Sequence, residues 1–422
     1  MGERSPEWEP AYAGRAARMR ASEIRELLKL LDQPDIISFA GGIPDPALFP
    51  EEAARSAYGA ILGDPALAKV ALQYSVSEGY LPLRQWIAGH MSRQGAPCDA
   101  GNILVTSGSQ QGLDFLARLL ISPGDTALVT WPTYLGALQA FGACEPRYDR
   151  LALDRTNITS PAYAEAAAAS GGRVKYAYVV PDFANPTGET MTLAARERLL
   201  SLAAELDIAV IEDAAYAALR YDGDPIPALI ALDAARTGHV DGARIIYCGT
   251  FSKTLTPGLR VGWICAARPV ISRLVLVKQA SDLNSPLLNQ MVMHRLAEAT
   301  YPAQVTASRD RYRARRDRML AALARHMPGG VRWTRPDGGL FVWLELPETI
   351  DGAQLLDRSV KEARVAFVPG RAFFADGSGA NTVRLSFSLA TEDEIEAGVE
   401  RLAAVLCREV AAVVTAGRCA PT

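Results

Sequence analysis

Short apolar runs alternate along the chain with longer stretches in which apolar residues recur every three or four positions. The short runs predict buried strands, and the longer stretches, such as 163–169 and 193–206, predict helices. The strands expected on this ground lie at 103–106, 127–129, 176–180, 208–211 and 245–248. Strands that alternate with helices favour right-handed βαβ units. The pattern therefore predicts an α/β fold in which helices cover both faces of a mainly parallel sheet.

The pattern changes after about residue 300. An arginine-rich helical stretch at 309–325 precedes three apolar runs, at 338–346, 365–368 and 383–388, and a final helix is expected from about Glu392. This order predicts a smaller α+β domain packed on the larger one. We therefore expect a large domain over residues 51–300, a small C-terminal domain over 301–422, and an N-terminal arm and helix over 1–50.

The composition is that of an ordinary globular enzyme, with 49% hydrophobic and 22% charged residues in a chain of 422. A formal net charge of -3 gives no reason to expect nucleic-acid binding. The chain has no run of 18 apolar residues, so we expect no membrane span. Six cysteines without a C-x-x-C pair indicate reduced thiols and a cytoplasmic protein. The four histidines lie far apart, so we expect no metal site.

The stretch from Gly249 to Gly262 is the most distinctive in the chain. It follows a predicted strand and places Lys253 among four hydroxyl residues, with Arg260 seven positions later. Residues 242–281 contain no Asp or Glu but six Lys or Arg. Such a loop is suited to phosphate binding, and the positive charge nearby would lower the pKa of the Lys253 amine and make it more nucleophilic. Taken alone, the stretch is explained equally well by an exposed basic loop.

Further polar clusters follow other predicted strands. The segment 107–111 joins a strand to a helix start, an arrangement that directs backbone N–H groups at an anion. Asn185 and Asp213 follow two more strands; separately, Asn185-Pro186 is most often a turn and Asp213 most often a helix N-cap. In parallel sheets, ligands bind outside the carboxyl ends of the strands, where we expect all of these clusters.

Together these segments resemble one family, the fold type I, class I/II aminotransferases that depend on pyridoxal phosphate. The resemblance spans residues 22 to 388 and implies a seven-stranded sheet in the large domain. It also implies pyridoxal 5'-phosphate as cofactor, and amino-group transfer between an L-α-amino acid and a 2-oxo acid by a ping-pong mechanism. The motifs that produce it are Ser107-Gly108-Ser109-Gln110-Gln111, Asn185-Pro186-Thr187-Gly188, Asp213-x-x-Tyr216, Ser252-Lys253 with Arg260, and Arg384.

The resemblance implies a role for each motif residue that would touch the cofactor. Lys253 is the catalytic residue and forms the internal aldimine. Asp213 pairs with the pyridine nitrogen, Asn185 and Tyr216 contact the ring oxygen, and Tyr134 stacks on the ring. The residues implied to hold the phosphate are Ser109, Gln110, Thr250, Ser252, Arg260 and, from a neighbouring subunit, Tyr74. If Tyr74 serves a neighbour's site, the working unit is at least a homodimer.

The residues implied to bind the substrate's α-carboxylate are Arg384, Asn185 and the backbone of Gly42. The segments 21–25, 39–42 and 71–74 resemble the 2-aminoadipate and kynurenine aminotransferases, in which an N-terminal helix moves over the site. This implies that Ser22 and Arg25 contact the substrate side chain, although a helix cap and a solvated arginine explain them equally well. Substrates with long acidic or aromatic side chains both fit the sequence.

Two other functions use similar residues. Another pyridoxal-phosphate reaction, such as β-elimination, decarboxylation or oxidation, needs the same core set, and the sequence does not separate it from transamination. A regulator with this fold would carry a sizeable DNA-binding domain ahead of it, whereas about twenty residues precede the first matched helix. We expect transamination. One departure from the family pattern, Asp182-Phe183-Ala184 before the Asn-Pro turn, is expected to affect substrate choice only.

Overall fold

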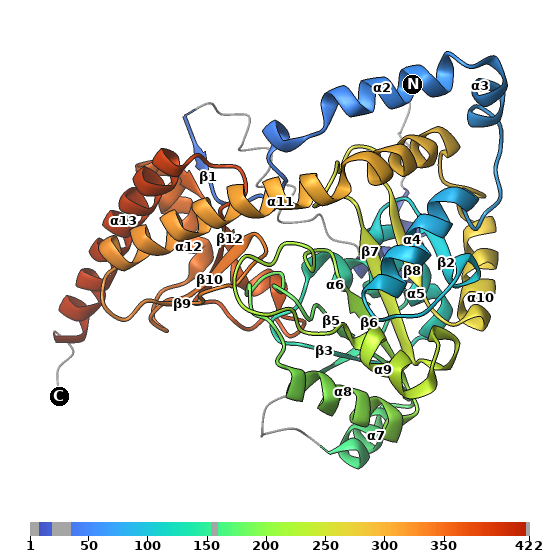
Figure 1. Cartoon of the computed structure of the whole chain (residues 1–422). Helices are drawn as coiled ribbons and strands as arrows, with labels where there is room; N and C mark the ends of the chain where they lie inside the picture. Colours follow the sequence, from blue (N-terminus) through green and yellow to red (C-terminus); the bar gives the residue numbers. More distant parts are fainter. Residues whose placement is uncertain (1–7, 19–34, 153–158, 419–422) are drawn as a thin grey trace, which may run out of the picture.

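The fold is that of a computed structural model, which describes residues 8–18, 35–152 and 159–418 (Figure 1). The predicted N-terminal helix, with Ser22 and Arg25, lies outside the described residues. None of the described helices combines the length and the hydrophobicity that crossing a membrane requires.

A seven-stranded sheet forms the centre of the larger part of the molecule. Its strands lie in the order β2-β8-β7-β6-β5-β3-β4, and only β8 runs antiparallel to its neighbours. The prediction of a mainly parallel sheet is confirmed. The bounds of its strands are β2 (Ile103–Thr106), β3 (Thr126–Val129), β4 (Arg147–Arg150), β5 (Val174–Val179), β6 (Ala209–Asp213), β7 (Ile245–Thr250) and β8 (Gly262–Cys265).

Helices cover both faces of this sheet, as predicted. Alternate residues of β5 separate the two sides: Tyr176 and Tyr178 pack in one hydrophobic cluster, Ala177 and Val179 in the other. The first cluster includes side chains of α5 (Ser109–Leu120), α6 (Leu135–Gly142) and α10 (Arg268–Gln279). The second includes side chains of α4 (Leu81–Arg93), α8 (Leu193–Leu206) and α9 (Leu229–Thr237). The remaining helices on this part are α2 (Glu51–Leu62), α3 (Pro65–Ala71) and α7 (Ser160–Ala169).

The smaller part is built on an antiparallel sheet in the order β12-β13-β10-β9. Its strands are β9 (Arg332–Trp333), β10 (Phe341–Glu345), β12 (Val368–Pro369) and β13 (Thr382–Ser386), and it carries α12 (Gly352–Arg358) and α13 (Glu392–Arg418). A separate parallel pair joins β1 (Ile37–Ser38) to β11 (Val365–Ala366), so the chain enters the smaller part before it builds the larger one.

One long helix, α11 (Leu287–His326), runs from the larger part to the smaller (Figure 1). It is 40 residues long and contains Pro302. The predicted domain boundary at residue 300 falls inside it, and the division into domains stays a prediction.

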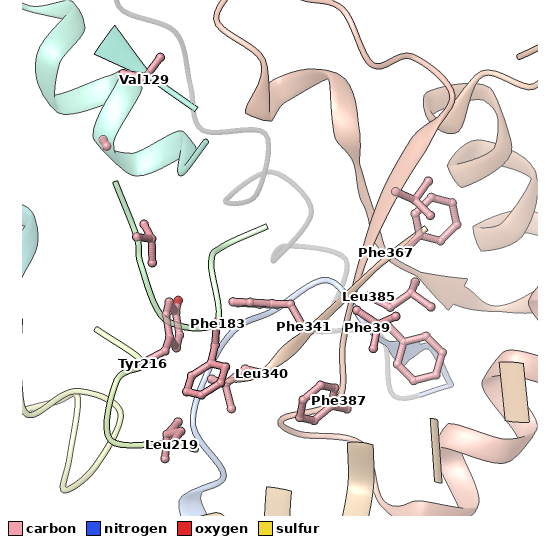
Figure 2. Close-up of a cluster of buried hydrophobic side chains, with 14 of the residues drawn as sticks. Phe39, Val129, Phe183, Tyr216, Leu219, Leu340, Phe341, Phe367, Leu385 and Phe387 are labelled. Atoms are coloured by element: carbon pink, nitrogen blue, oxygen red, sulfur yellow. The ribbon is translucent and has the colours of Figure 1, made fainter. Parts of the chain in front are cut away.

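A continuous apolar cluster joins the two parts beside the carboxyl ends of the large sheet. Figure 2 shows Phe341, at the start of β10, with Tyr216 and Phe183 on one side and Phe39 and Phe387 toward the small sheet. The Phe341 and Tyr216 rings meet edge to face at 5.6 Å. Burial of several aromatic rings here fixes the small part against the polar strand ends.

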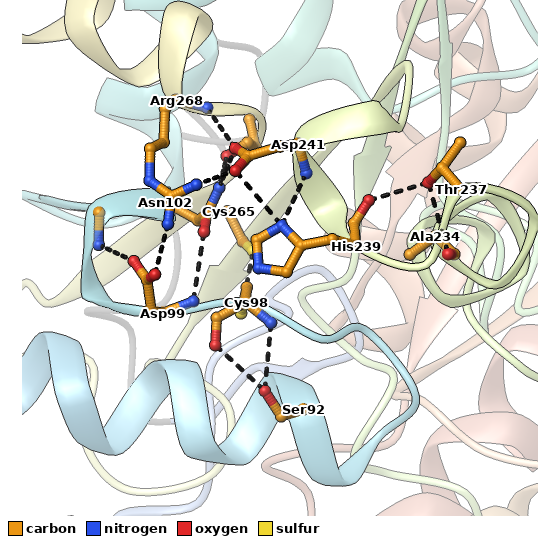
Figure 3. A network of polar contacts seen from close by, with 12 residues as sticks. Ser92, Cys98, Asp99, Asn102, Ala234, Thr237, His239, Asp241, Cys265 and Arg268 are labelled. Carbon is orange, nitrogen blue, oxygen red and sulfur yellow. Dashed lines mark hydrogen bonds and ion pairs between the residues drawn. The ribbon is translucent and has the colours of Figure 1, made fainter.

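A polar network holds the start of β2, at the end of the strand opposite to the polar 107–111 segment (Figure 3). Asn102 Nδ2 donates to Asp241 Oδ1 at 2.8 Å and to the Ala266 carbonyl at 3.0 Å. Arg268, at the start of α10, pairs with both Asp241 and Asp99. The network ties β2, β8 and α10 together, so the strand that ends in the polar 107–111 segment is held at its far end.

Candidate active site

The polar clusters that follow the predicted strands meet in one cavity of about 160 Å³ at the carboxyl ends of β2, β5, β6 and β7. This is the position at which open α/β sheets bind ligands. The residues that line it are Ser109, Gln110, Tyr134, Val180, Asn185, Asp213, Ala215, Tyr216, Thr250, Ser252, Lys253, Pro257 and Arg260.

One end of the cavity is a cradle of backbone N–H groups, hydroxyls and a guanidinium. Gly108, with φ +80°, turns the chain from β2 into α5, and a Cβ there would lie 2.3 Å from Arg260 Nη2. Only glycine allows this approach, which places Arg260 beside the N-terminus of α5. Thr250 Oγ1 donates to Ser252 Oγ at 2.9 Å and accepts from Ser252 N at 3.1 Å. This end is suited to a phosphate.

Lys253 follows β7 and projects into the middle of the cavity. Its Nζ donates to the Gly42 carbonyl at 2.8 Å and lies 5.9 Å from the Tyr216 ring centre. Burial lowers the pKa of Lys253 to about 8, with help from the charges of Arg384 and Arg260 and against that of Asp213. The amine therefore has a substantial neutral fraction near neutral pH, as a nucleophile requires.

Asp213 ends β6 on the far side of the cavity from the cradle. Tyr178 donates its hydroxyl to Asp213 Oδ2 at 2.8 Å, whereas Asp213 Oδ1 is buried and has no hydrogen-bond partner among the described residues. Burial raises the pKa of Asp213 to about 6, and the Tyr178 bond and the nearby Ala215 N–H oppose the rise. A buried oxygen without a partner points to a donor that a ligand supplies.

Arg384 lies in β13 of the small sheet but reaches the same region. It is 1% exposed and donates to Asn185 Oδ1 and to the Ala40 carbonyl, each at 2.7 Å. Its guanidinium lies over the rings of Phe341 and Phe373 at 4.3 and 5.1 Å. Burial lowers the pKa of Arg384 to about 10, which leaves it charged at neutral pH. No carboxylate of the described residues pairs with Arg384, and a buried cation of this kind is suited to binding an anionic substrate group.

Comparison with known proteins decides which family this cavity belongs to. The family model described as aminotransferase class I and II matches residues 50–402. The chain belongs to this family. Its polar strand ends are therefore those of an aminotransferase, and the resemblance found in the sequence is confirmed.

Relatives that match nearly the full length of the chain include aminotransferases. An aromatic-amino-acid aminotransferase 1 from Thermococcus litoralis is 41% identical over 409 residues, which cover 96% of each chain. A 2-aminoadipate transaminase from Thermus thermophilus is 41% identical and covers 94% of this chain and 97% of its own. A kynurenine aminotransferase from Pyrococcus horikoshii, solved with PMP, superimposes with a TM-score of 0.87 at 41% identity, covering 95% of this chain and 98% of that one.

The protein is a transaminase, and its cofactor is pyridoxal 5'-phosphate. The cavity fits this group on three independent counts. The cradle beside Arg260 suits a phosphate, the orphaned Asp213 Oδ1 suits a protonated ring nitrogen, and Lys253 Nζ lies between them. The residues that line the cavity come from the ends of several different strands, which explains why a single local motif predicts so little.

Four further residues that were predicted to touch the cofactor line the cavity around Lys253. Asn185 Nδ2 and the Tyr216 hydroxyl are 3.4 Å apart, and Tyr134 OH donates to Gln110 Oε1, also at 3.4 Å. Gln110 Nε2 in turn donates to the Gly136 carbonyl at 2.6 Å. Burial raises the pKa of Tyr134 to about 12, so its hydroxyl stays protonated. Every predicted cofactor residue except Tyr74 lines the cavity.

The Gly42 backbone is held rigidly although it lies in a loop. Ser388 Oγ donates to the Ile43 carbonyl at 2.7 Å, and Arg315 in α11 pairs with Asp45 at 2.8 Å. A Cβ at Gly42 would lie 2.5 Å from the Phe341 ring. Glycine is therefore needed where the loop passes between Lys253 and the small sheet.

Tyr74 does not reach this cavity; its side chain is 79% exposed on the segment between α3 and α4. Ser22 and Arg25 lie outside the described residues. Asp182, the departure noted in the sequence, accepts from Arg196 and Arg220 at 2.9 and 3.0 Å. This buried pair supports the Asn185 turn from behind and does not face the cavity.

Tyr178 is a residue of the candidate site that the sequence analysis did not select. It sits inside a predicted strand, where a tyrosine is normally a core residue. Its role becomes visible only when β5 and β6 pair, with Tyr178 opposite Ile211 in the register, and its hydroxyl meets Asp213. The available signal is a buried tyrosine one residue before the end of a strand in the active-site sheet.

Proposed function

We propose that this transaminase takes the amino group from L-α-amino acids with long side chains, of the 2-aminoadipate or aromatic type, with Lys253 as the catalytic residue. The observation that supports it most is the arrangement around Lys253 Nζ. A partly neutral buried amine lies between a phosphate cradle, an orphaned carboxylate oxygen and a buried arginine.

The cofactor is held at both ends by this chain's residues. Ser109, Thr250, Ser252 and Arg260, with Gln110, bind the phosphate through N–H, O–H and guanidinium groups. Tyr134 contacts the ring, and Asn185 and Tyr216 donate to its oxygen. When bound, pyridoxal phosphate supplies a carbonyl that accepts the amino group and a ring that withdraws electrons from the substrate's α-carbon.

Asp213 keeps that ring electron-poor. Its Oδ1, buried and without a partner among the described residues, would accept a hydrogen bond from the protonated ring nitrogen, and the negative charge would stabilise that protonated form. Tyr178 holds the other oxygen and so fixes the carboxylate plane.

Arg384 binds the substrate's α-carboxylate and thereby orients the α-carbon. Two of its donors are engaged, by Asn185 and the Ala40 carbonyl, and its Nε has no partner among the described residues. The substrate's carboxylate would therefore replace neutral acceptors as the partner of the guanidinium, and Asn185 would stay beside it. A guanidinium fixes both position and plane, which selects the bond at the α-carbon that reacts.

Lys253 moves the proton. In its neutral form, Nζ removes the proton from the substrate's α-carbon and returns it on the cofactor side. The contact between Nζ and the Gly42 carbonyl, at 2.8 Å, would hold the amine in the cavity once substrate has displaced it from the cofactor. The Tyr216 ring, whose centre is 5.9 Å from Nζ, packs edge to face on Phe341 and places apolar surface beside the amine.

A homodimer with shared sites completes the proposal. Tyr74, which reaches a neighbour's phosphate in it, lies in a segment, residues 62–81, that exposes the apolar side chains of Leu62, Val70, Leu72, Tyr74, Val76 and Leu81. A surface of this kind supports a subunit interface. The free thiols of the five described cysteines support a cytoplasmic location. Residues 1–50 are proposed to complete the site over the substrate, with Ser22 and Arg25 beside its side chain, and the division at residue 300 separates the large and small domains.

The test is a half-reaction with a panel of amino acids and no oxo acid. We expect 2-aminoadipate, kynurenine, tyrosine or phenylalanine to convert the cofactor to its amine form and release one equivalent of the matching 2-oxo acid. Release of ammonia or carbon dioxide instead would replace transamination by another reaction. Conversion by alanine or aspartate alone would leave the enzyme class but refute the proposed substrates.

A further inference from the structure

The phosphate cradle is braced from behind by a buried lysine that plays no part in the chemistry described above. Lys278, near the end of α10, has a fully buried side chain. Its Nζ donates to both oxygens of Asp282, at 2.8 and 2.9 Å, and to Ser285 Oγ at 2.9 Å. Gln111 Oε1 lies 3.4 Å from the same nitrogen.

This cluster is connected to the cradle by two direct contacts. Gln111 Oε1 accepts from the backbone N–H of Ser107 at 2.8 Å, and Gln111 Nε2 donates to Asp282 Oδ2 at 2.8 Å. Ser107 Oγ donates to Ser285 Oγ at 3.3 Å. The turn at Ser107 and Gly108 is thus held by the lysine cluster on one side and by Arg260, whose Nη2 donates to the Ser107 carbonyl at 3.4 Å, on the other.

We propose that Lys278 is a positioning residue for cofactor binding, which sets the Ser107–Ser109 turn in the geometry that the phosphate needs. The inference rests on the proposed role of that turn in holding the phosphate. Gly108 has a φ of +80°, and a glycine can adopt many other backbone conformations. A turn that contains it binds an anion well only when the surrounding structure fixes the backbone of the turn in advance.

The charge balance of the cluster supports a positioning role over a direct one. Lys278 is paired with Asp282, so the pair adds little net charge to the cradle. Burial lowers the pKa of Lys278, and the Asp282 carboxylate, which Nζ contacts at 2.8 and 2.9 Å, opposes this. Removal of Lys278 leaves Gln111, Asp282 and Ser285 without their common donor, and the turn loses its fixed partner.

The test compares the dissociation constant for pyridoxal phosphate, measured by titrating apoenzyme, in Lys278→Met, Gln111→Leu and Arg316→Met. Arg316 is the matched control, since it is a buried cation paired with Asp222 and Asp317, remote from the cradle. We expect Lys278→Met and Gln111→Leu to raise the dissociation constant at least tenfold and to broaden the phosphorus NMR signal of the bound cofactor. The kcat at saturating cofactor should fall much less. Arg316→Met should lower the unfolding midpoint and leave the dissociation constant unchanged.

Two results would overturn the inference. One is that Lys278→Met lowers the unfolding midpoint but keeps the dissociation constant for pyridoxal phosphate within twofold of wild type. This result would show that Lys278 has a purely structural role. The other is an unchanged dissociation constant in Gln111→Leu, which removes no charge and serves as the deciding variant if Lys278→Met does not fold. Arg260→Leu separates the two proposals: if it too leaves the dissociation constant unchanged, the phosphate site itself is misplaced.

Discussion

Glu212 and Asp213 are neighbours in β6, and both are buried carboxylates. They differ in the hydrogen bonds that their oxygens accept. Burial raises the pKa of Glu212 to about 7 and that of Asp213 to about 6. Both oxygens of Glu212 accept backbone N–H bonds, from Leu229 at 2.8 Å and Ile230 at 2.9 Å, where α9 begins. Asp213 has one oxygen bonded to Tyr178 and one without a partner among the described residues.

Burial and a raised pKa therefore do not by themselves identify a carboxylate that acts in the active site. Successive side chains of a strand point to opposite faces, so Glu212 faces the helix α9 and Asp213 faces Tyr178 and the cavity. Glu212 satisfies the first N–H groups of a helix, a structural use of a carboxylate. Asp213 has one oxygen without a partner among the described residues, and we propose that the cofactor's ring nitrogen supplies that partner.

The largest effect is expected from Asp213→Asn. The amide does not hold a proton on the cofactor's ring nitrogen, so kcat should fall by at least about 100-fold while the cofactor still binds. Steady-state kinetics with a saturating donor and oxo acid measure the change. A loss of less than tenfold would show that Oδ1 does not face the ring.

Glu212→Gln should have the opposite effect to Asp213→Asn: it should lower stability and leave kcat nearly unchanged. Its amide nitrogen would meet a backbone N–H donor of α9 instead of accepting from it, which costs about 1–3 kcal/mol of unfolding free energy. Chemical denaturation of the apoenzyme measures this cost, and kcat should stay within about twofold of wild type because Glu212 does not touch the cavity. A large fall in kcat with unchanged stability would erase the distinction between the two carboxylates.

Tyr178→Phe should weaken the reaction less than Asp213→Asn does. It removes the bond to Asp213 Oδ2 but keeps the ring that packs with Phe141 at 5.4 Å. A single buried hydrogen bond to a charged group contributes about 1.5–3 kcal/mol, so a fall in kcat of roughly tenfold is expected. The matched control is Tyr176→Phe on the same face of β5, whose hydroxyl has no partner among the described residues and whose loss should leave kcat unchanged.

The smallest effect is a shift in pH dependence. Since burial and the two arginines lower the pKa of Lys253 to about 8, uptake of pyridoxal phosphate by the apoenzyme should accelerate as pH rises and level off above about 8. Asp213 opposes that lowering, so Asp213→Asn should move the midpoint to lower pH and Glu212→Gln should not move it. Stopped-flow mixing across pH 6–10 gives the midpoints; equal shifts in both variants would contradict the geometry.

The sequence predicted those parts of the fold in which local pattern and burial agree. The strand 103–106 and the helix 193–206 have the expected bounds, because an apolar run and a regular helical period define them. The edge strand β4 (Arg147–Arg150) was not predicted, since it is polar and partly exposed. The first half of α11 was also missed, because Pro302 lies within it and proline normally interrupts a helix.

The same distinction applies to the site. Lys253, Asp213, Asn185 and the Ser107–Gln111 segment could be predicted because each follows a strand, and parallel strands end at one edge. Tyr178 and Lys278 could not, because each acts through a partner that is distant in sequence: Asp213 for one, and Gln111 and the Ser107 turn for the other. Their importance comes from tertiary contacts alone.

The most direct test of the central claim is to locate the bond between cofactor and chain. Wild-type and Lys253→Ala enzymes are incubated with pyridoxal phosphate, reduced with borohydride, digested and analysed by mass spectrometry. We expect one phosphopyridoxyl group on the peptide that contains Lys253, stoichiometric in wild type and absent in the variant. Labelling of another lysine, or of none in wild type, would contradict it.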